Sequence, residues 1–310
     1  MRLTALIHFD NIRIRYAKGR AAMGRIIRIE KESFEKKSDI KSAMSGGLID
    51  ASALELYTDY SENQLRHIFE PAPGIFIAET PNVIERALDA GYEPLSFFIE
   101  DKFLNDKTSR LIERSAAAPV YTADHDTMKS LTGYNITMGS LCAMKRKALP
   151  SAEEVCRGKS RIAFLDDVEN PTNVGAIFRS AAALGMEAVI LTSSCADPLY
   201  RRAIRVGMGT VFQIPWTMAD RPGSKLISDL RQLGFKCAAM ALKENTFSID
   251  DDLLNGEEKL AVVLGSEGYG LPDETIDACD ITVKIPMYNG VDSLNVAAAA
   301  AVAFWQLRRR

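Results

Sequence analysis

The stretch IAFLDDVENPTNVGAIFRSAAALGMEAVILT (162–192) decides the fold of this chain. Two short apolar runs, 162–166 and 188–192, lie on either side of a segment with helical periodicity at 174–184. Short apolar runs bounded by turn residues are typical of buried strands. Because a helix between two strands usually carries the chain back to the same edge of the sheet, the stretch predicts two parallel strands joined by a covering helix.

The same alternation continues to the end of the chain. We therefore predict an α/β fold in which a mostly parallel sheet is covered by helices on both faces. Further strands are expected at 211–215, 237–242, 260–265 and 281–286, and helices at about 198–206, at 224–233, shortly after Leu271 and over the closing segment LNVAAAAAVAFWQLRRR.

A second, smaller α/β unit is expected before residue 150. Asp124 is suited to cap a helix in DHDTMKSLTG, and Gly91 is suited to end the helix in PNVIERALDAG in the left-handed conformation. Strands are expected at 76–79, 94–100, 119–123 and 139–145. The predicted organisation is a basic N-terminal extension (1–48), a small α/β domain (49–146), a linker (147–160) and a C-terminal domain (161–310).

Composition indicates a cytoplasmic globular protein. The chain has 310 residues, of which 47% are hydrophobic and 25% are charged, with a net charge of −3. Five cysteines without a C-x-x-C pair argue against a disulfide framework or a zinc site, so no metal is expected. Asp10 and Arg13 interrupt the region where a signal peptide needs an apolar run. Because the histidines (8, 67 and 125) all precede the C-terminal domain, serine–histidine or cysteine–histidine catalysis within that domain is excluded.

Basic residues are concentrated locally. Residues 1–40 contain ten Lys and Arg against five Asp and Glu, whereas 161–310 contain 15 against 19. A smaller group, Arg201, Arg202 and Arg205, is a candidate for contacts with phosphates, although a solvated surface is the default interpretation of such a group.

Polar side chains cluster after the strand 162–166. In open α/β sheets ligands bind at the carboxyl ends of strands, where loops lead into helices. Asn173 is suited to cap the following helix. Arg179 lies about 140° from the apolar side of that helix, given a helical repeat of about 100° per residue, so it is expected outside the core.

Two later strand ends are also unusual. LAVVLGSEGYGL (260–271) runs into three glycines with Glu267 as the one charge among them, which permits close approach to a ligand or a tight turn. In IPMYNGVDSLNVAAAAA (285–301), Ser293 is suited to cap the final helix. Asn295 would then lie inside the first helical turn, where its amide gives the helix little and is free for another role.

These three segments together resemble the signature motifs of the SpoU/TrmH family. The matching patterns are N-P-x-N-x-G-x-x-x-R (170–179), L-G-x-E-x-x-G-L (264–271) and I-P-M-x-x-G-x-x-S-L-N-V (285–296). That family is a branch of the SPOUT superfamily of AdoMet-dependent RNA 2′-O-ribose methyltransferases. The resemblance covers about residues 55–310, and the segment GIFIAETPNVIERAL (74–88) is similar to the ribosomal-protein-like substrate-binding domain that often precedes the catalytic one.

The resemblance implies a deep C-terminal trefoil knot, a homodimer, S-adenosyl-L-methionine (AdoMet) as methyl donor and rRNA or tRNA as substrate. By motif position, the implied catalytic residues are Asn173, Arg179, Glu267, Ser293 and Asn295. The implied cofactor-binding residues are Leu264, Gly265, Glu267, Gly270, Ile285, Pro286, Met287, Ser293, Leu294 and Asn295.

The role of Arg179 has two interpretations. The family's usual proposal makes the first-motif arginine a base, but a guanidinium stays protonated above about pH 12. We favour a clamp that binds the target phosphate and stabilises the developing alkoxide.

The sequence departs from the family pattern in one loop. This loop commonly reads R-A-S-x-G in the family, whereas here Val206 and Gly207 replace the small residue and the serine. Alternative functions are a non-catalytic RNA-binding assembly factor and, more weakly, a base methylase on the same scaffold.

Overall fold

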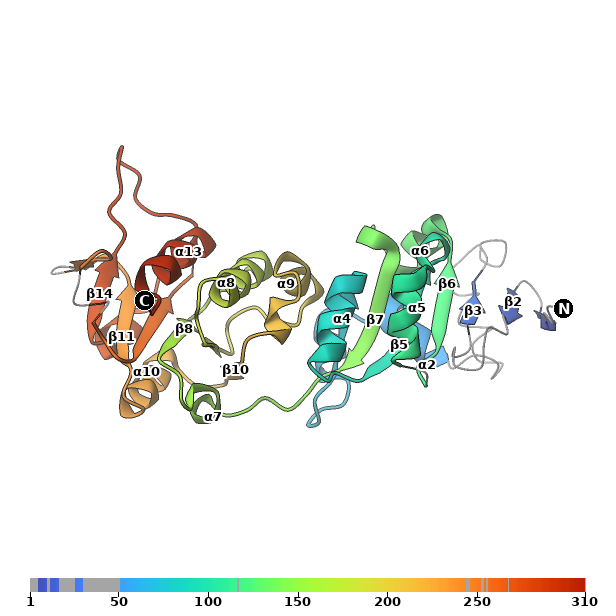
Figure 1. The fold of residues 1–310 in the computed structure, drawn as a ribbon, viewed down its shortest axis with the longest axis horizontal. Coiled ribbons are helices and arrows are strands. Elements are labelled where there is room, and N and C mark those ends of the chain that lie inside the picture. Colours follow the sequence, from blue (N-terminus) through green and yellow to red (C-terminus); the bar gives the residue numbers. More distant parts are fainter. Residues whose placement is uncertain are drawn as a thin grey trace. The chain divides into compact units, whose positions relative to one another are not determined.

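The chain forms two compact units, residues 1–148 and 149–310, each with its own seven-stranded sheet (Figure 1). No helix in the described part of the chain is long and apolar enough to cross a membrane. The computed structural model describes residues 5–9, 12–16, 26–29, 51–115, 117–243, 246–251, 254, 256–266 and 268–309.

The first unit is a mixed sheet with strand order β1-β2-β3-β6-β5-β7-β4. Strands β3, β5 and β6 run parallel, whereas β7 runs antiparallel to β4 and β5. Its strands are β1 Ala5–Phe9, β2 Ile12–Tyr16, β3 Ile26–Arg28, β4 Ile75–Glu79, β5 Pro94–Glu100, β6 Val120–Ala123 and β7 Ser140–Lys145. Its helices are α2 Ala51–Thr58, α3 Glu62–His67, α4 Pro81–Asp89, α5 Asp106–Glu113 and α6 His125–Thr132, with 3-10 turns η2 Asp101–Phe103 and η3 Thr137–Gly139.

A buried tyrosine, Tyr57 on α2, joins this helix to the sheet. The Tyr57 hydroxyl donates to the Ser96 carbonyl oxygen (2.7 Å) and accepts from the Ala143 amide (2.9 Å). Asp124 caps α6 by accepting from the Thr127 amide at 2.8 Å, and Gly91 adopts a positive φ of 74° after α4. Part of the stretch 1–48, expected to be a separate extension, pairs with this sheet, because β3 lies beside β6.

The second unit is an all-parallel sheet with strand order β10-β9-β8-β13-β11-β14-β12. This confirms the predicted α/β fold with a mostly parallel sheet. Its strands are β8 Arg161–Leu165, β9 Ala188–Thr192, β10 Trp216–Ala219, β11 Lys236–Met240, β12 Phe247–Ser248, β13 Leu260–Leu264 and β14 Ile281–Lys284. Its helices are α7 Ala152–Cys156, α8 Pro171–Ala183, α9 Arg201–Val206, α10 Gly223–Gln232, α12 Asp273–Ala278 and α13 Val296–Leu307, with a 3-10 turn η4 Thr210–Phe212.

Helices cover both faces of this sheet. Helices α8, α9 and α13 pack together above it in Figure 1, and α7 and α10 lie below it. The lower core includes Val155, Leu226 and Ile227 with the strand residues Phe164 and Val263. Because strands such as β8, β9 and β13 are buried along their whole length, they have continuous apolar sequences instead of alternating ones.

Two expectations about this unit were wrong. The apolar run 211–215 is not a strand, because Gly209 turns the chain at φ 77° and the Phe212 and Gln213 amides donate to the Gly209 and Thr210 carbonyls, which closes the turn η4. The expected linker 147–160 contains α7, whose residues Val155 and Cys156 are buried. The S-x-x-E pattern of Ser151 and Glu154 forms a capping box, with the Ser151 amide donating to the Glu154 carboxylate at 2.8 Å.

Candidate active site

Helix α8 begins one residue after Asn170. The Asn170 side chain accepts from the Thr172 amide at 2.9 Å, and Pro171 occupies the first helical position, where its fixed φ suits a helix start. The expectation that Asn173 caps this helix was therefore wrong. Asn173 lies within the first turn, where its side chain is buried at 8% exposure.

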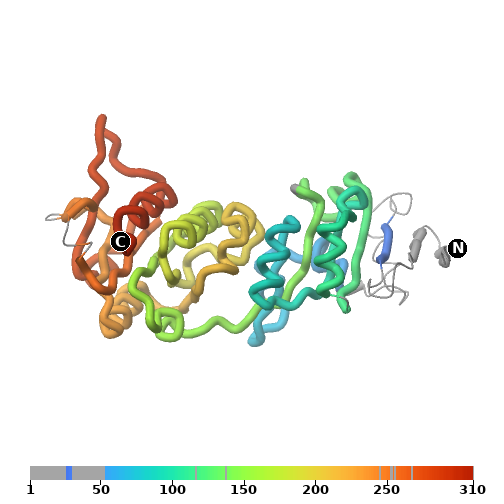
Figure 2. Tube along the Cα trace, viewed as in Figure 1, coloured from blue at the N-terminus to red at the C-terminus, as the bar shows by residue number. Residues whose placement is uncertain are grey.

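Helix α13 begins after Asn295, whose side chain accepts from the Ala297 amide at 3.0 Å. Ser293, expected to be the cap, lies two residues earlier and is exposed. The helical region begins later than expected, because residues 285–295 form an extended loop that projects from the sheet in Figure 2.

The two helix starts are joined by a hydrogen bond. The Asn295 Nδ2 donates to the Asn173 Oδ1 at 3.2 Å, across 122 positions of sequence. Helices α8 and α13 pack against each other, so the bond closes one end of a helix–helix contact. The first and third motifs are therefore brought together, and Asn295 serves both as a cap and as a donor to Asn173.

The motif glycine Gly175 has a packing role. A Cβ added at Gly175 would lie 2.3 Å from the Ala203 carbonyl oxygen, so α8 and α9 approach too closely for any side chain at this position. Gly207 is also tightly packed, since a Cβ added there would lie 3.0 Å from the Gly175 carbonyl oxygen. The replacement of the family's serine by Gly207 therefore occurs at a close helix contact.

The second motif forms a tight turn after β13. Ser266 and Gly270 exchange backbone hydrogen bonds of 3.0 and 3.1 Å, which close the turn. Gly265 is required here, because a Cβ would lie 2.4 Å from the Gly270 carbonyl carbon. Glu267, predicted to be both catalytic and cofactor-binding, lies outside the described residues.

A cleft of about 450 Å³ lies at the carboxyl ends of β11, β13 and β14. Sheet order explains its position, since β11 lies between β13 and β14 and the loops after all three strands meet at one edge. The cleft is lined by residues 240–243, Leu264, Gly265, Ser266, 268–271, Asp273, Ile276, 283–285, Met287, 292–294, Val296 and Ala299.

Most of the predicted cofactor-binding residues line this cleft. Pro286 and Asn295 do not line it, but each is next in sequence to residues that do. The predicted residues that line it are Leu264, Gly265, Gly270, Ile285, Met287, Ser293 and Leu294.

The cleft also includes residues that the sequence patterns did not indicate. Leu242 and Lys243 follow β11, Tyr269 lies in the second-motif turn, and Asp273 begins α12. Lys243 Nζ and Asp273 Oδ1 form an ion pair at 2.5 Å. This hydrogen-bonded pair raises the pKa of Lys243 and lowers the pKa of Asp273. The position of Lys243 after a predicted strand could have indicated it as a site residue. Its place beside the loops of the second and third motifs, however, depends on strand order.

A buried carboxyl group lies at the end of β8. Asp166 is 3% exposed and accepts from the Thr275 hydroxyl at 2.7 Å. Burial raises the pKa of Asp166, although hydrogen bonds from Thr275 and Thr192 oppose the shift. No cluster of three or more His, Cys, Asp or Glu side chains within the described ranges could hold a metal ion.

The structure does not bring Arg179 to the asparagine pair. Arg179 is exposed on α8, as its helical position predicts. It lies six residues after Asn173, which is about 9 Å along the helix axis and roughly 120° around it. On α9, Arg202 and Arg205 are exposed and Arg201 is half-buried.

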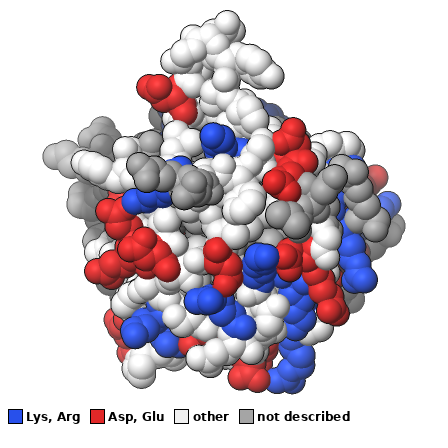
Figure 3. All heavy atoms as spheres, turned by 90° about the vertical axis from the view of Figure 1, so that its left-hand side faces the viewer, with Lys and Arg blue, Asp and Glu red and all other residues white. Residues whose placement is uncertain are grey.

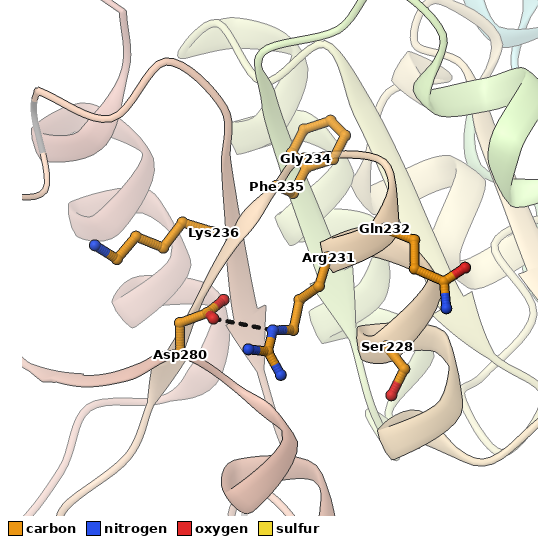
Figure 4. A pocket seen from close by; sticks show the side chains of 7 residues that line it. All are labelled: Ser228, Arg231, Gln232, Gly234, Phe235, Lys236 and Asp280. Carbon is orange, nitrogen blue, oxygen red and sulfur yellow. Dashed lines mark ion pairs between the residues drawn. The ribbon is translucent and has the colours of Figure 1, made fainter.

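A larger hollow of about 620 Å³ lies at the other edge of the sheet, beside the start of β11 (Figure 4). Its cations are already paired, because Arg231 Nε lies 2.9 Å from Asp280 Oδ1 and Lys236 Nζ lies 2.6 Å from Glu257 Oε1. None of the three sequence motifs contributes to it. The face of the second unit in Figure 3 mixes basic and acidic side chains instead of presenting one sign of charge.

Comparisons with known proteins agree with this geometry. Residues 160–305 match the model of the SpoU rRNA Methylase family. An uncharacterized tRNA/rRNA methyltransferase of Mycobacterium tuberculosis is 35% identical over 84% of this chain and 90% of its own length. The chain belongs to the SpoU family of RNA methyltransferases. A 23S rRNA (guanosine(2553)-2′-O)-methyltransferase of Bacillus subtilis is 25% identical over 75% of this chain and 88% of its own length.

Solved structures support the fold. An AdoMet-bound rRNA methyltransferase from Sinorhizobium meliloti aligns with a TM-score of 0.69 at 20% identity, covering 84% of this chain and 94% of that one. A structure described as an RNA 2′-O ribose methyltransferase aligns with a TM-score of 0.66 at 23% identity, covering 90% of this chain and 97% of that one. Both share the α/β architecture described above.

Proposed function

We propose that this protein transfers a methyl group from AdoMet to a ribose 2′-hydroxyl of structured rRNA or tRNA. The observation that carries the proposal is the Asn295–Asn173 hydrogen bond, which joins the first and third motifs next to the cleft. The ribose specificity is further supported by the relative from Bacillus subtilis and the solved structure that are described as 2′-O-methyltransferases.

The residues of the cleft fit AdoMet. Its volume of about 450 Å³ lies in the range of small-molecule sites, about 300–1,000 Å³. Gly270 leaves exposed backbone for a nucleoside, Ile285 and Met287 supply apolar contact, and Ser293 supplies a hydroxyl. When bound, AdoMet supplies an electrophilic methyl group on a positively charged sulfur.

The remaining requirement is to orient the ribose hydroxyl and stabilise its charge as its proton leaves. Such positioning contributes much of the acceleration in a displacement reaction. We assign the charge-stabilising role to Arg179, whose planar fork can bind a phosphate and the developing alkoxide together. Asn173 and Asn295 hold each other's amides in place, and Glu267 and Ser293 complete the proposed catalytic set.

We further propose that the enzyme is a homodimer whose sites lie near the subunit interface. Arg179 lies on a different side of α8 from Asn173, so a second subunit could present it to a cleft. On α13, Val302 is 40% exposed and Trp305 is 57% exposed, and together with Ala298 they form one apolar face at helical spacing. Replacing Trp305 with Glu should shift the protein to monomers in analytical ultracentrifugation, and an unchanged dimer would contradict the use of this face.

The first unit is proposed to bind RNA, with exposed cations such as Arg110 on α5 and Lys129 on α6 as contacts. On the second unit, Arg202 and Arg205 are proposed phosphate contacts. Reversing the charge of Arg110 and Lys129 in the full chain should weaken RNA binding in fluorescence anisotropy, whereas unchanged affinity would assign RNA binding elsewhere.

The C-terminal knot is also proposed. Strand β14 lies on the opposite side of β11 from β13. After β14 the chain crosses back, and α13 packs on α8 and β13, which are earlier elements of the same unit. An experimental structure in which the final helix passes through no other loop would contradict the knot.

The function is tested by mapping 2′-O-methyl groups in rRNA and tRNA from a strain that lacks the gene. We expect one site to disappear and to return when the gene is restored. If no ribose site is lost, the substrate assignment fails. AdoMet binding measured by calorimetry without methyl incorporation into any RNA pool would favour the alternative, a non-catalytic RNA-binding assembly factor. Methylation found on a base would favour the base methylase.

A further inference from the structure

One side chain at the cleft is unusually exposed. Tyr269 is 100% exposed, although its ring is a large apolar group that proteins normally cover at least in part. It also lines the cleft between β11, β13 and β14. An uncovered aromatic ring at the entrance to a binding site is a candidate contact for a ligand.

The backbone that carries Tyr269 is held in place. The turn is closed by the two Ser266–Gly270 backbone hydrogen bonds, and the Tyr269 amide itself donates to the Ser266 hydroxyl at 3.3 Å. Gly268 and Gly270 flank the tyrosine, and a Cβ at either position would meet nothing within 4 Å. The ring therefore stands on an anchored turn with open space on both sides.

Other apolar groups are exposed around the same opening. Leu242 is 68% exposed and Leu294 is 39% exposed, and both line the cleft. The charged residues described in the cleft lining are Lys243, Asp273, Lys284 and Asp292, two of each sign, and Lys243 and Asp273 form an ion pair. The entrance therefore favours a flat, partly apolar ligand over a strongly charged one.

We propose that Tyr269 stacks on the base of the RNA nucleotide whose ribose is presented to AdoMet at the entrance of the cleft. This inference rests on the proposed function, in which the ribose of the target nucleotide is methylated. We expect that nucleotide to leave the RNA stack so that its ribose reaches the cleft. Unstacked bases are commonly held by aromatic side chains, and each such contact contributes about 1–3 kcal/mol. Tyr269 is then a positioning residue, because it holds the base while other groups act on the ribose.

The test compares Tyr269→Ala with Tyr269→Phe in the full-length protein, with total RNA from the gene-deletion strain as substrate. Stacking needs the ring and not the hydroxyl, so Tyr269→Phe should keep kcat/KM for RNA near that of the native enzyme. Tyr269→Ala should lower it roughly 5- to 150-fold, mainly through a raised KM for RNA. The Kd for AdoMet, measured by calorimetry, should stay unchanged in both variants.

The matched control is Tyr288→Ala. Tyr288 is 80% exposed in the 285–295 loop but does not line the cleft. An equal loss of kcat/KM in Tyr288→Ala would overturn the assignment to the cleft entrance. A weaker Kd for AdoMet in Tyr269→Ala would assign the ring to the cofactor instead, and a shift to monomers would assign it to a subunit contact.

The two proposals fail separately. If the native enzyme transfers no methyl group to RNA, the proposed function fails. If the native enzyme is active and Tyr269→Ala has an unchanged kcat/KM, only the stacking role of Tyr269 fails.

Discussion

Polar side chains differ in burial and hydrogen bonding between the amino and carboxyl edges of the sheet in the second unit. At the amino edge, Arg161 is 2% exposed and donates to the carbonyl oxygens of Leu307, Ser160, Glu258 and Glu257 at 2.7 to 3.1 Å. At the carboxyl edge, Ser293 and Tyr269 are exposed and line the cleft. At the amino edge, Arg161 therefore holds elements together, whereas the carboxyl edge has both structural bonds, such as Asn295 to Asn173, and exposed side chains that are available for a ligand.

The same helix, α13, is fixed at both edges. Arg161 binds the carbonyl of Leu307 at its C-terminal end, and Asn295 caps its N-terminal end. One bond supports the fold alone, whereas the other also orients Asn173. This contrast predicts that substitutions at the two edges will separate stability from activity.

The largest effect is expected for Arg179. Arg179→Lys should lower kcat about 10²–10³-fold, since a lysine cannot reproduce a bidentate clamp and loss of one charge-stabilising donor typically has this cost. Because the side chain is exposed, the melting temperature should not change. Methyl transfer to RNA and thermal unfolding are the measurements. Near-normal turnover in Arg179→Lys would rule out the clamp.

Arg161→Met should have the opposite profile. It removes the donors to the buried Leu307 carbonyl and to three part-buried carbonyls. Since a buried unpaired group costs about 1–3 kcal/mol, a loss of about 3 kcal/mol is expected in the free energy of unfolding. The chain's two tryptophans, Trp216 and Trp305, both lie in this unit, so urea unfolding followed by their fluorescence reports its stability.

Arg231→Met is the matched control for Arg161. Its side chain is 52% exposed and pairs with Asp280 at the same edge, and a surface pair of this kind contributes at most about 1 kcal/mol. Equal losses for the two variants would show that burial of Arg161 is not what makes it important.

Asn295→Ser separates the two roles of Asn295. Serine caps helices about as well as asparagine, so the stability should be almost unchanged. Its shorter side chain cannot reach Asn173, so kcat/KM should fall roughly tenfold, the upper value for one net hydrogen bond. If Asn295→Ser has native activity, the hydrogen bond between Asn295 and Asn173 is not needed for methyl transfer. Asn295→Ala should in addition lose about 1 kcal/mol of stability.

The smallest effect concerns Glu187, at the amino edge. Burial opposes its ionisation, but hydrogen bonds from the Ser160 and Arg161 amides (2.6 and 3.0 Å) and from the Ser160 hydroxyl outweigh burial and lower the pKa of Glu187. Its stabilising contribution is therefore complete above the unfolded value of about 4.3 and is lost as the pH falls through the lower folded pKa.

Glu187→Gln should cost about 1 kcal/mol at pH 7, with a difference from the native protein that shrinks as the pH falls below about 4. Urea midpoints measured between pH 7 and pH 3 test this sign. A difference that grows toward low pH would show that these hydrogen bonds do not favour the ionised carboxylate.

Sequence patterns predicted the second unit well where the signal is local. The buried strands β8, β9 and β13 are continuous apolar runs, and Arg179 is exposed as its helical angle indicates. Helix starts were predicted less well, because several neighbouring residues can cap. The choice of Asn170 over Asn173, and of Asn295 over Ser293, depends on where the backbone turns.

The sequence by itself determined the α/β class, the three motifs and the membership of the family that they indicate. Only the tertiary structure decided that β11 lies between β13 and β14, which brings Lys243 and Tyr269 into one cleft, and that Asn295 reaches Asn173. The physical reason is that hydrophobic periodicity and capping act over a few residues. Strand order and contacts between distant helices depend instead on how the whole unit buries its apolar surface.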